Sequence, residues 1–216
     1  MIVKPDCQSQ GKGIFLTNEL ERLPRDELSV VQEYISSPYL IDGLKFDMRV
    51  YVLVISCDPL TIYVANEGLV RFATQSYEQV NVNSHPNTLK NMFVHLTNYA
   101  LNKDNAEFKQ AADSTDETGH KRSISSLYKR LREDGHDTDA IHARIKDLIL
   151  KTVLSIQHEL SHSYRSVQPA DSESRMCFEL LGFDIMLHAD GTPTLLEVNS
   201  APSFATDSPL DYCIKR

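Results

Sequence analysis

The chain has 216 residues, of which 41% are apolar and 24% charged, so it can form a packed core and is not expected to be disordered. Its 30 acidic residues outnumber 22 basic ones, and the formal charge of −8 argues against nucleic acid or a membrane as a partner. No stretch has the roughly 18 uninterrupted apolar residues of a membrane helix. The start lacks a signal-peptide pattern, so we expect a soluble intracellular protein, and its four well-separated cysteines predict reduced thiols.

The first half of the chain is rich in patterns typical of β-strands. A hairpin is expected over residues 60–66 and 69–74, turning at Glu67-Gly68, and residues 75–119 are predicted to be mostly loop around the apolar island 92–96. Earlier strands are predicted over residues 2–5, 14–16, 29–35 and 45–56, the last of them closed by the Asp58-Pro59 turn.

The second half begins with a helical pattern at Ser123. Strands follow over residues 177–187 and 194–199, so the mixture of many strands with few helices predicts an α+β fold. One apolar stripe at helical spacing should pack on a sheet, and it consists of Ile141, Ile145, Leu148, Ile149, Val153, Ile156 and Leu160.

The last two strands form a predicted hairpin whose register can be derived from the sequence. Residues 190–191 are Asp-Gly, a strong two-residue turn signal. If Ala189 pairs with Thr192, then Asp184 lies opposite Glu197. The alternate side chains should point into the core, namely Phe183, Ile185, Leu187, Leu196 and Val198.

This register predicts a metal site. Asn199 shares a strand face with Glu197, so two carboxylates and an amide oxygen would converge with Asp184. Like charges opposed across a ladder repel, and an all-oxygen ligand set between them favours Mg²⁺. A solvated edge hairpin with scattered acids is the alternative interpretation.

A charged face is predicted on the long strand at residues 45–56. Lys45, Asp47 and Arg49 alternate with the apolar Phe46 and Met48, so one face carries cation, anion and cation. Such a face can be a surface ion-pair ladder, or it can clamp phosphate oxygens with Lys as a point charge and Arg as a fork. The glycine loop at residues 11–13 can likewise be interpreted as a plain hairpin or as a loop whose backbone N–H groups cover a phosphate.

One motif matches the pattern of a different class of enzyme. Residues 158–162 fit the HExxH pattern of zinc metalloproteases, with His158 and His162 one helical turn apart. Both histidines fall opposite the apolar stripe and are expected to face solvent. A zinc protease is therefore the weakest of the functional hypotheses.

Several short motifs occur in one order along the chain. They are Lys4-Pro5-Asp6, Gln10-Gly11-Lys12-Gly13-Ile14, Gln32-Glu33-Tyr34-Ile35, Lys45-Phe46-Asp47-Met48-Arg49, His95-Leu96-Thr97-Asn98-Tyr99 and Leu195-Leu196-Glu197-Val198-Asn199. This ordered set resembles the tubulin–tyrosine ligase-like family of ATP-grasp enzymes. Residues 52–60 look most like the polyglutamylase branch of that family.

The resemblance implies an ATP-grasp fold, a mostly antiparallel sheet flanked by helices, with the family's N-terminal portion truncated. Residues 1–44 would be the remainder of the small subdomain, with the phosphate loop and adenine hinge. Residues 45–216 would be the C-terminal subdomain with the metal and amino-acid sites.

The resemblance also assigns roles to individual residues. Catalytic roles fall to Lys45, Arg49 and Glu197, with Arg49 at the γ-phosphate. ATP contacts fall to Lys4, Gln10, Gly11, Gln32, Glu33, Tyr34, Ile35, Lys45, Phe46, Asp47, Thr97 and Asn98. Mg²⁺ would be held by Asp184, Glu197 and Asn199, and the amino acid or acceptor by Gln10, Arg71, Tyr99, Lys121 and Lys215.

The implied reaction is ATP-dependent addition of free L-glutamate to glutamate side chains of tubulin tails through an acyl phosphate. The alternatives are a glycine or tyrosine ligase of the same family, or a non-catalytic fragment that only binds tubulin. We expect a monomer in the cytoplasm on the cytoskeleton, with the cilium or basal body as candidate sites. Residues 121–132 carry five basic residues and no acid, which predicts a local patch for an acidic tubulin tail.

Overall fold

The computed structural model describes residues 1–6, 11–19, 21, 23, 28–80, 84, 86–113, 115–167 and 177–216. In these residues the chain forms two sheets, in which every paired strand is antiparallel, together with helices. This mixed α and β composition agrees with the predicted fold class. No described helix combines the length and the apolar character required to cross a lipid bilayer.

The smaller sheet is built from the N-terminal residues. Its order is β2 (Phe15–Leu16), β1 (Ile2–Pro5) and β3 (Ser29–Gln32), with the side chain of Val3 fully buried. These strands confirm the predictions for residues 2–5 and 14–16, whereas β3 ends three residues before the predicted end at residue 35. Residues 33–35 therefore leave the sheet as a connection without regular secondary structure.

The larger sheet has the long strand β5 at its centre. In spatial order its strands are β7 (Lys121–Ser123), β6 (Leu60–Phe72), β5 (Leu44–Cys57), β8 (Glu179–Leu187) and β9 (Pro193–Ser200). Strand β4 (Leu40–Ile41) also pairs with β5, so the larger sheet already begins before residue 45.

The helices differ greatly in length. They are α1 (Pro86–Lys90), α2 (Met92–His95), α3 (Tyr99–Asn102), α4 (Ile124–Glu133), α5 (Thr138–Val167) and α6 (Pro209–Lys215). Helix α4 begins where the sequence predicts it, because the Ser123 hydroxyl caps its first turn by accepting from the Ser126 N–H at 3.1 Å. The predicted loop around residues 92–96 thus contains three short helices.

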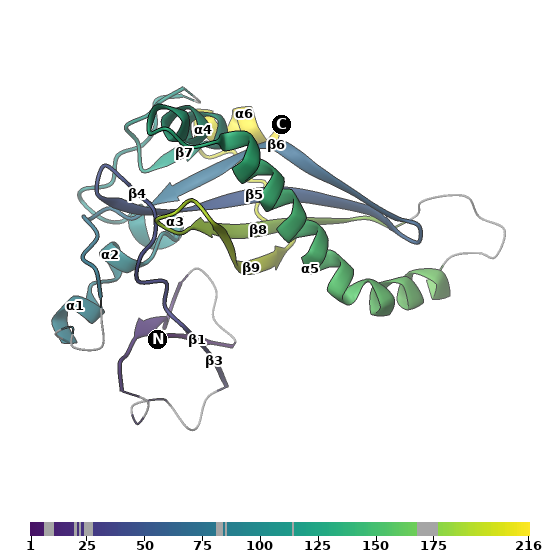
Figure 1. Ribbon diagram of the computed structural model, residues 1–216, viewed down its shortest axis with the longest axis horizontal. Coiled ribbons are helices and arrows are strands. Elements are labelled where there is room, and N and C mark those ends of the chain that lie inside the picture. Colours follow the sequence, from purple (N-terminus) through teal and green to yellow (C-terminus); the bar gives the residue numbers. More distant parts are fainter. Residues whose placement is uncertain are drawn as a thin grey trace.

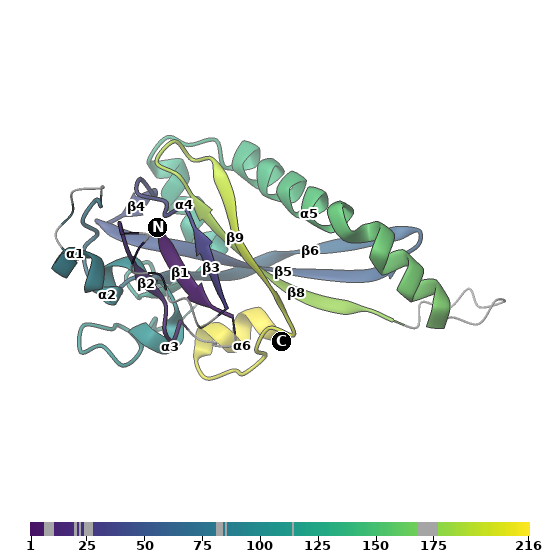
Figure 2. The ribbon, with the colours of Figure 1, turned by 90° about the horizontal axis from the view of Figure 1, so that it is seen from below.

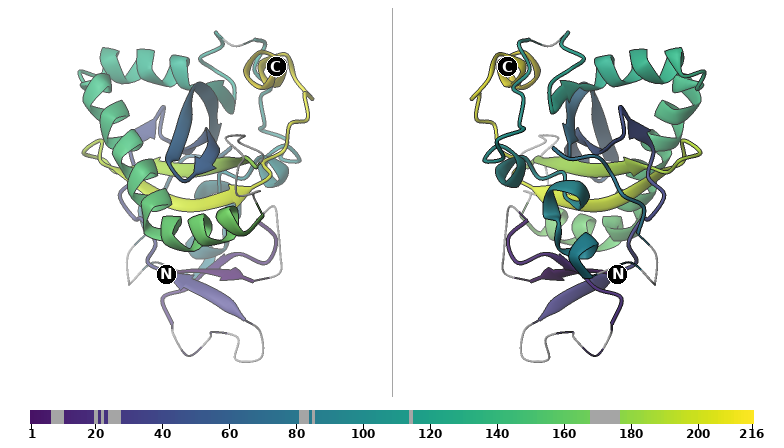
Figure 3. Two further views of the ribbon diagram at one scale, coloured as in Figure 1. Left: turned by 90° about the vertical axis from the view of Figure 1, so that its right-hand side faces the viewer. Right: turned by 90° about the vertical axis from the view of Figure 1, so that its left-hand side faces the viewer.

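The main core lies between the larger sheet and helices α4 and α5. Phe46, Met48 and Val50 of β5 are at most 3% exposed, and they pack with Ile145 and Ile149 of α5. Burial of alternate residues on β5 leaves the other face of the strand for charged side chains. The N-terminal sheet lies on that other face and forms a layer of its own (Figures 1, 2 and 3).

Strand β6 corrects one prediction. The expected hairpin at Glu67-Gly68 is wrong, because β6 runs without a turn through both residues and pairs with β5. Gly68 is needed for close packing: a Cβ there would lie 2.4 Å from the Arg49 carbonyl oxygen. Glu67 accepts hydrogen bonds from the Ser125 N–H and hydroxyl at the start of α4. The real turn between β5 and β6 is the predicted one at Asp58-Pro59.

The end of α5 also differs from the prediction. The apolar stripe is buried through Val153 except for the partly buried Leu148, but Ile156 is 51% exposed and Leu160 is 37% exposed. The second half of the helix runs alongside the outer ends of β5 and β6 rather than over the middle of the sheet (Figure 1).

The β8–β9 hairpin brings Asp184 opposite Glu197, as predicted, but by a different route. Leu187 pairs with Pro193, one residue away from the predicted register, and an irregularity between Asp184 and Ile185 restores it. The bulge turns Leu195 to the core and Leu196 to a cavity. Val198 keeps its predicted partner Phe183 but is 40% exposed, so neither Leu196 nor Val198 is a core residue as expected.

The predicted basic patch at residues 121–132 is largely neutralised. Lys129 pairs with Glu117 at 2.5 Å, and Arg130 pairs with both Asp42 and Asp134. Lys121 is buried, as is Arg122. This segment therefore offers little unpaired positive charge for an acidic tail.

Candidate active site

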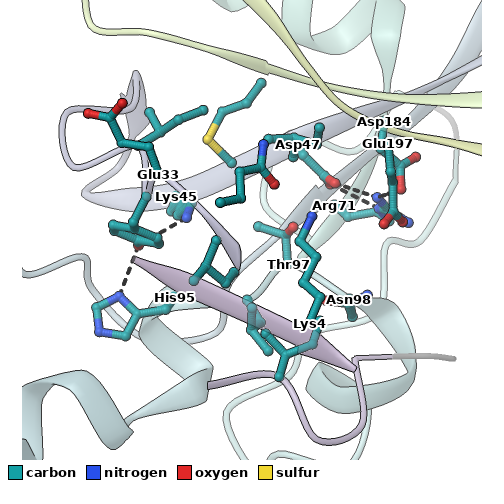
Figure 4. A pocket seen from close by; sticks show the side chains of 18 residues that line it. Lys4, Glu33, Lys45, Asp47, Arg71, His95, Thr97, Asn98, Asp184 and Glu197 are labelled. Atoms are coloured by element: carbon teal, nitrogen blue, oxygen red, sulfur yellow. Dashed lines mark hydrogen bonds and ion pairs between the residues drawn. The ribbon is translucent and has the colours of Figure 1, made fainter. Parts of the chain in front are cut away.

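A cavity lies between the N-terminal sheet and the charged face of the larger sheet (Figure 4). The space inside it is about 630 Å³, part of which is open solvent. Its walls come from segments far apart in sequence. They include Ile2, Lys4 and Ile14, residues 32–35, Lys45 and Asp47, Arg71, residues 95–98, Asp184 and Met186, and Leu196 and Glu197.

Lys45 projects into the cavity from β5. Its side chain is buried, and its Nζ donates to the Tyr34 hydroxyl at 3.0 Å and lies 4.3 Å from the centre of that ring. Burial lowers the pKa of Lys45 to about 7; the nearby Asp47 acts in the opposite direction and Lys4 in the same one. An anionic ligand would restore the full positive charge of Lys45, since opposite charge favours the ionised form.

Two arginines and two aspartates form a buried network beside Lys45. Arg71 donates through Nε to Asp47 at 2.9 Å, and its Nη2 pairs with Asp184 at 2.8 Å. Arg49 donates from both Nε and Nη2 to Asp184. Both carboxylates are 3% exposed. With Lys45, these four residues are called the pocket cluster below.

The pairing follows from the sheet register. Asp47 is the direct partner of Arg71 on β6, and Arg49 is the direct partner of Asp184 on β8. Burial lowers the pKa of Arg71, but Asp47 and Asp184 outweigh it, so the pKa is raised overall. Burial alone would raise the pKa of Asp184, whereas its bonds to Arg49 and its charge contact with Arg71 hold it below the usual range.

The predicted metal ligands come together at the edge of the pocket cluster. Asn199 Nδ2 lies 3.4 Å from both Asp184 Oδ2 and Glu197 Oε1. Burial and the charge of Asp184 raise the pKa of Glu197. A site of side-chain oxygens with one destabilised carboxylate suits a hard divalent cation, so the donor set fits Mg²⁺. Asp184 is also neutralised by the arginines, which the sequence argument did not foresee.

Thr97 and Asn98 reach the cavity because a buried amide anchors their loop. Asn102, only 1% exposed, donates to the carbonyls of Leu96 and Asn98 and accepts from the Thr74 N–H and hydroxyl. All of its hydrogen-bonding capacity is thus used to tie the loop to the end of β6.

A second charged group lies at helix α6. Asp211 is 1% exposed, and its carboxylate pairs with Lys121 at 2.5 Å and with Lys215 at 2.8 Å. The Lys121 ammonium also lies 4.5 Å from the centre of the Tyr99 ring. These four residues are called the α6 cluster below. Lys121 is the register partner of Arg71, so the α6 cluster adjoins the pocket cluster across β6 and β7.

Some predicted site residues lie elsewhere. Phe46 is 1% exposed in the core, so its side chain cannot contact a ligand in the cavity. Arg49 holds Asp184 rather than forming part of the cavity wall. Gly11, with φ of +81°, packs against Asn98, while Gln10 lies outside the described residues.

Sequence reasoning missed two residues. His95 appeared only inside a motif, yet its ring lies in the cavity wall and bonds to Tyr34. Asp211 carried no signal, because an aspartate at the third position of a short helix is common. Neither can be found without the contacts that join distant segments.

His158 and His162 of the HExxH pattern are both exposed on the outer side of α5. No cluster of three metal-binding His, Cys, Asp or Glu side chains occurs in the described part of the chain. The pattern therefore has a plain structural explanation as the solvent face of a helix.

The family assignment comes from comparison with known proteins. The model of the tubulin-tyrosine ligase family matches residues 1–216, so the chain belongs to this family. The predicted resemblance is thereby confirmed.

Relatives in this family carry specific names. The chain is 50% identical to a "Probable beta-tubulin polyglutamylase" of Tetrahymena thermophila, with all of the chain covering 18% of that protein. It is 46% identical to mouse "Tubulin polyglutamylase TTLL6" and 43% identical to human "Tubulin polyglutamylase TTLL7", covering 25% and 24% of those proteins. The chain thus spans about a quarter of these relatives or less.

Proposed function

We propose that this chain carries the catalytic region of an ATP- and Mg²⁺-dependent ligase that joins glutamate to glutamate side chains of tubulin tails. The observation that carries the proposal is one cavity between two sheets in which Lys4, Lys45 and Arg71 meet two candidate metal carboxylates, Asp184 and Glu197. The names of the relatives support the choice of tubulin and glutamate.

The geometry suits an ATP-grasp arrangement, with the nucleotide between the sheets. Residues 32–35, which line the cavity, would contact adenine, and Lys4 extends from β1 toward the carboxylates, where phosphates would lie (Figure 4). Residues 1–44 and 45–216 would be the two subdomains. The change of sheet before residue 40 supports a division close to this boundary.

The reaction must overcome repulsion between a triphosphate and an acidic acceptor. Lys45 would bind phosphate oxygens, and Arg49 would reach the γ-phosphate once it releases Asp184. Mg²⁺ held by Asp184, Glu197 and Asn199 would neutralise phosphate charge. The acceptor carboxylate takes the γ-phosphoryl group as ADP leaves, and the glutamate α-amine then displaces phosphate to form an isopeptide bond.

The incoming glutamate has two carboxylates, which cations near the phosphates should hold. Arg71 and the adjoining α6 cluster, with Lys121, Lys215 and Tyr99, are the proposed site. Asp211 shares its single charge between two ammonium groups, so one positive charge remains for a substrate carboxylate.

The test is incorporation of labelled amino acids into microtubules by the full-length protein with ATP and Mg²⁺. Glutamate should be incorporated, and neither glycine nor tyrosine should be. Incorporation of glycine or tyrosine alone would assign the chain to another branch of the family. Binding to microtubules with no incorporation at all would favour the non-catalytic alternative.

We further propose that the protein acts as a monomer on the cytoskeleton in the cytoplasm, with the cilium or basal body as candidate locations. Tubulin as the substrate is the reason for this placement. Fluorescent tagging of the full-length protein together with a microtubule marker tests it, and a diffuse signal that ignores microtubules would contradict it.

A further inference from the structure

Behind Lys45 lies a chain of hydrogen bonds that the proposed reaction does not use. Lys45 Nζ lies 3.0 Å from the Tyr34 hydroxyl, and that hydroxyl lies 3.0 Å from His95 Nδ1. His95 Nε2 in turn lies 2.8 Å from the Thr88 carbonyl oxygen. The bonds between Lys45, Tyr34 and His95 are drawn in Figure 4.

The donor and acceptor of each hydrogen bond follow from the Thr88 carbonyl at the end of this chain of bonds. The Thr88 carbonyl can only accept, so His95 Nε2 carries the proton and donates. Burial lowers the pKa of His95, which keeps the ring neutral and makes Nδ1 an acceptor. The Tyr34 O–H therefore donates to Nδ1, and its oxygen lone pairs face the Lys45 ammonium.

The environment keeps this arrangement rigid. His95 is 1% exposed and Lys45 is 4% exposed. The His95 ring meets the rings of Tyr34 and Tyr77 edge to face, at 5.6 and 6.1 Å between centres. A lysine side chain is otherwise flexible, so a fixed acceptor at its tip decides where its remaining N–H groups point.

We propose that Tyr34 and His95 are positioning residues that aim the Lys45 ammonium at the phosphates of the bound nucleotide. This inference rests on the proposed function. His95 acts through Tyr34, and Tyr34 acts through Lys45. The pair should thus affect binding of the phosphates and have little effect on binding of the adenine base.

Two substitutions break the chain at different bonds. Tyr34→Phe removes the hydroxyl and keeps the ring. His95→Gln keeps an amide near the position of Nε2 but leaves no acceptor at Nδ1, whereas His95→Asn places an amide oxygen near Nδ1. Tyr39→Phe is the matched control, because the Tyr39 hydroxyl donates to Asp134 on the surface, away from the cavity.

Affinities for ATP and for adenosine are measured by displacement of a fluorescent ATP analogue from the full-length protein. Tyr34→Phe and His95→Gln should each weaken ATP binding about tenfold, the usual effect of losing a hydrogen bond to a charged group. Adenosine affinity should change less than about twofold, and His95→Asn should stay within about threefold of the wild type for ATP.

The double variant Tyr34→Phe/His95→Gln tests whether His95 acts on Lys45 through Tyr34. If His95 acts through Tyr34, the double variant is no weaker for ATP than either single one, about tenfold in all. A loss of ATP affinity near a hundredfold in the double variant, or equal losses of ATP affinity and adenosine affinity, would overturn the inference. If His95→Gln does not fold, Tyr34→Phe decides alone through its ATP and adenosine affinities.

ATP binding by the wild-type protein distinguishes a failure of this inference from a failure of the proposed function. Failure of the wild type to bind ATP would contradict the function itself. Normal ATP binding by the wild type and an equal affinity in Tyr34→Phe would refute only the positioning role.

Discussion

The pocket cluster and the α6 cluster are both buried, adjoin each other, and balance their charges in different ways. In the pocket cluster Arg71 bridges Asp47 and Asp184, Arg49 pairs with Asp184 alone, and the group lies at a cavity. In the α6 cluster one carboxylate is shared by two ammonium groups. The comparison shows that the arginines of the pocket cluster would have to exchange carboxylate partners to bind a ligand, whereas the α6 cluster already has one positive charge more than its single acid balances.

The largest expected effect comes from opening the pocket cluster. Arg71→Ala would leave Asp47 and Asp184 buried with fewer partners, which should lower the free energy of unfolding by about 3–5 kcal/mol. Arg71→Lys keeps the charge but loses the fork, so it should cost less. Urea denaturation measures both, and unchanged stability of Arg71→Ala would mean that the network is not formed in solution.

The next effect is on chemistry without a loss of fold. Glu197→Gln removes a proposed metal ligand at the edge strand β9, and glutamate incorporation should fall by about a hundredfold or more. The stability should stay near that of the wild type, because the amide is of equal size and part of the Glu197 side chain remains exposed although its carboxylate faces the cavity. Unchanged turnover would refute the proposed metal site.

The α6 cluster can be opened at its single acid. Asp211→Asn keeps the shape but leaves Lys121 and Lys215 without their counterion, which should lower the free energy of unfolding by about 1–3 kcal/mol. A matched loss is not expected from Asp207→Asn, since Asp207 is exposed. Equal stability of Asp211→Asn and the wild type would show that the cluster contributes nothing.

The same group predicts a pH dependence. Burial would raise the pKa of Asp211, but hydrogen bonds from Lys121 and Lys215 lower it overall. Because the pKa of Asp211 is lower in the folded protein than in the unfolded chain, its carboxylate stabilises the fold at pH values above the unfolded pKa of about 3.9. This stabilisation is lost as the pH falls through the pKa that Asp211 has in the folded protein. Thermal melts between pH 6 and 3 should therefore fall less steeply for Asp211→Asn, and equal slopes would contradict this.

The smallest effect should come from a surface pair. Lys129 and Glu117 are 59% and 42% exposed, so Lys129→Ala should change the free energy of unfolding by less than about 0.5 kcal/mol. A loss as large as that of Arg71→Ala would remove the distinction between buried and surface ion pairs.

The parts of the site that depend on local pattern could be predicted from the sequence. Alternation put Lys45, Asp47 and Arg49 on one face of β5, and the Asp-Gly turn put Asp184 opposite Glu197. The pairing of Arg71 with both Asp47 and Asp184 could not be derived, because it also depends on β8, which lies more than 100 residues after β6 in the sequence.

Errors in the prediction have local physical causes. Gly68 was interpreted as a turn, but it is the position where a strand passes the Arg49 carbonyl too closely for any side chain. Leu196 was assigned to the core because strict alternation was assumed, and a one-residue bulge turns it to the cavity. A bulge and a tight strand crossing are tertiary features without a clear signal in the sequence.

The central claim is that ATP lies between the two sheets. Photolabelling of the full-length protein with 8-azidoadenosine triphosphate, followed by mass spectrometry, tests it most directly. The account predicts that label falls on residues 32–35 or on cavity-wall residues such as Met186 and Leu196, and that excess ATP prevents it. Label on the outer face of α4 or α5, or label that ATP does not prevent, would contradict the account.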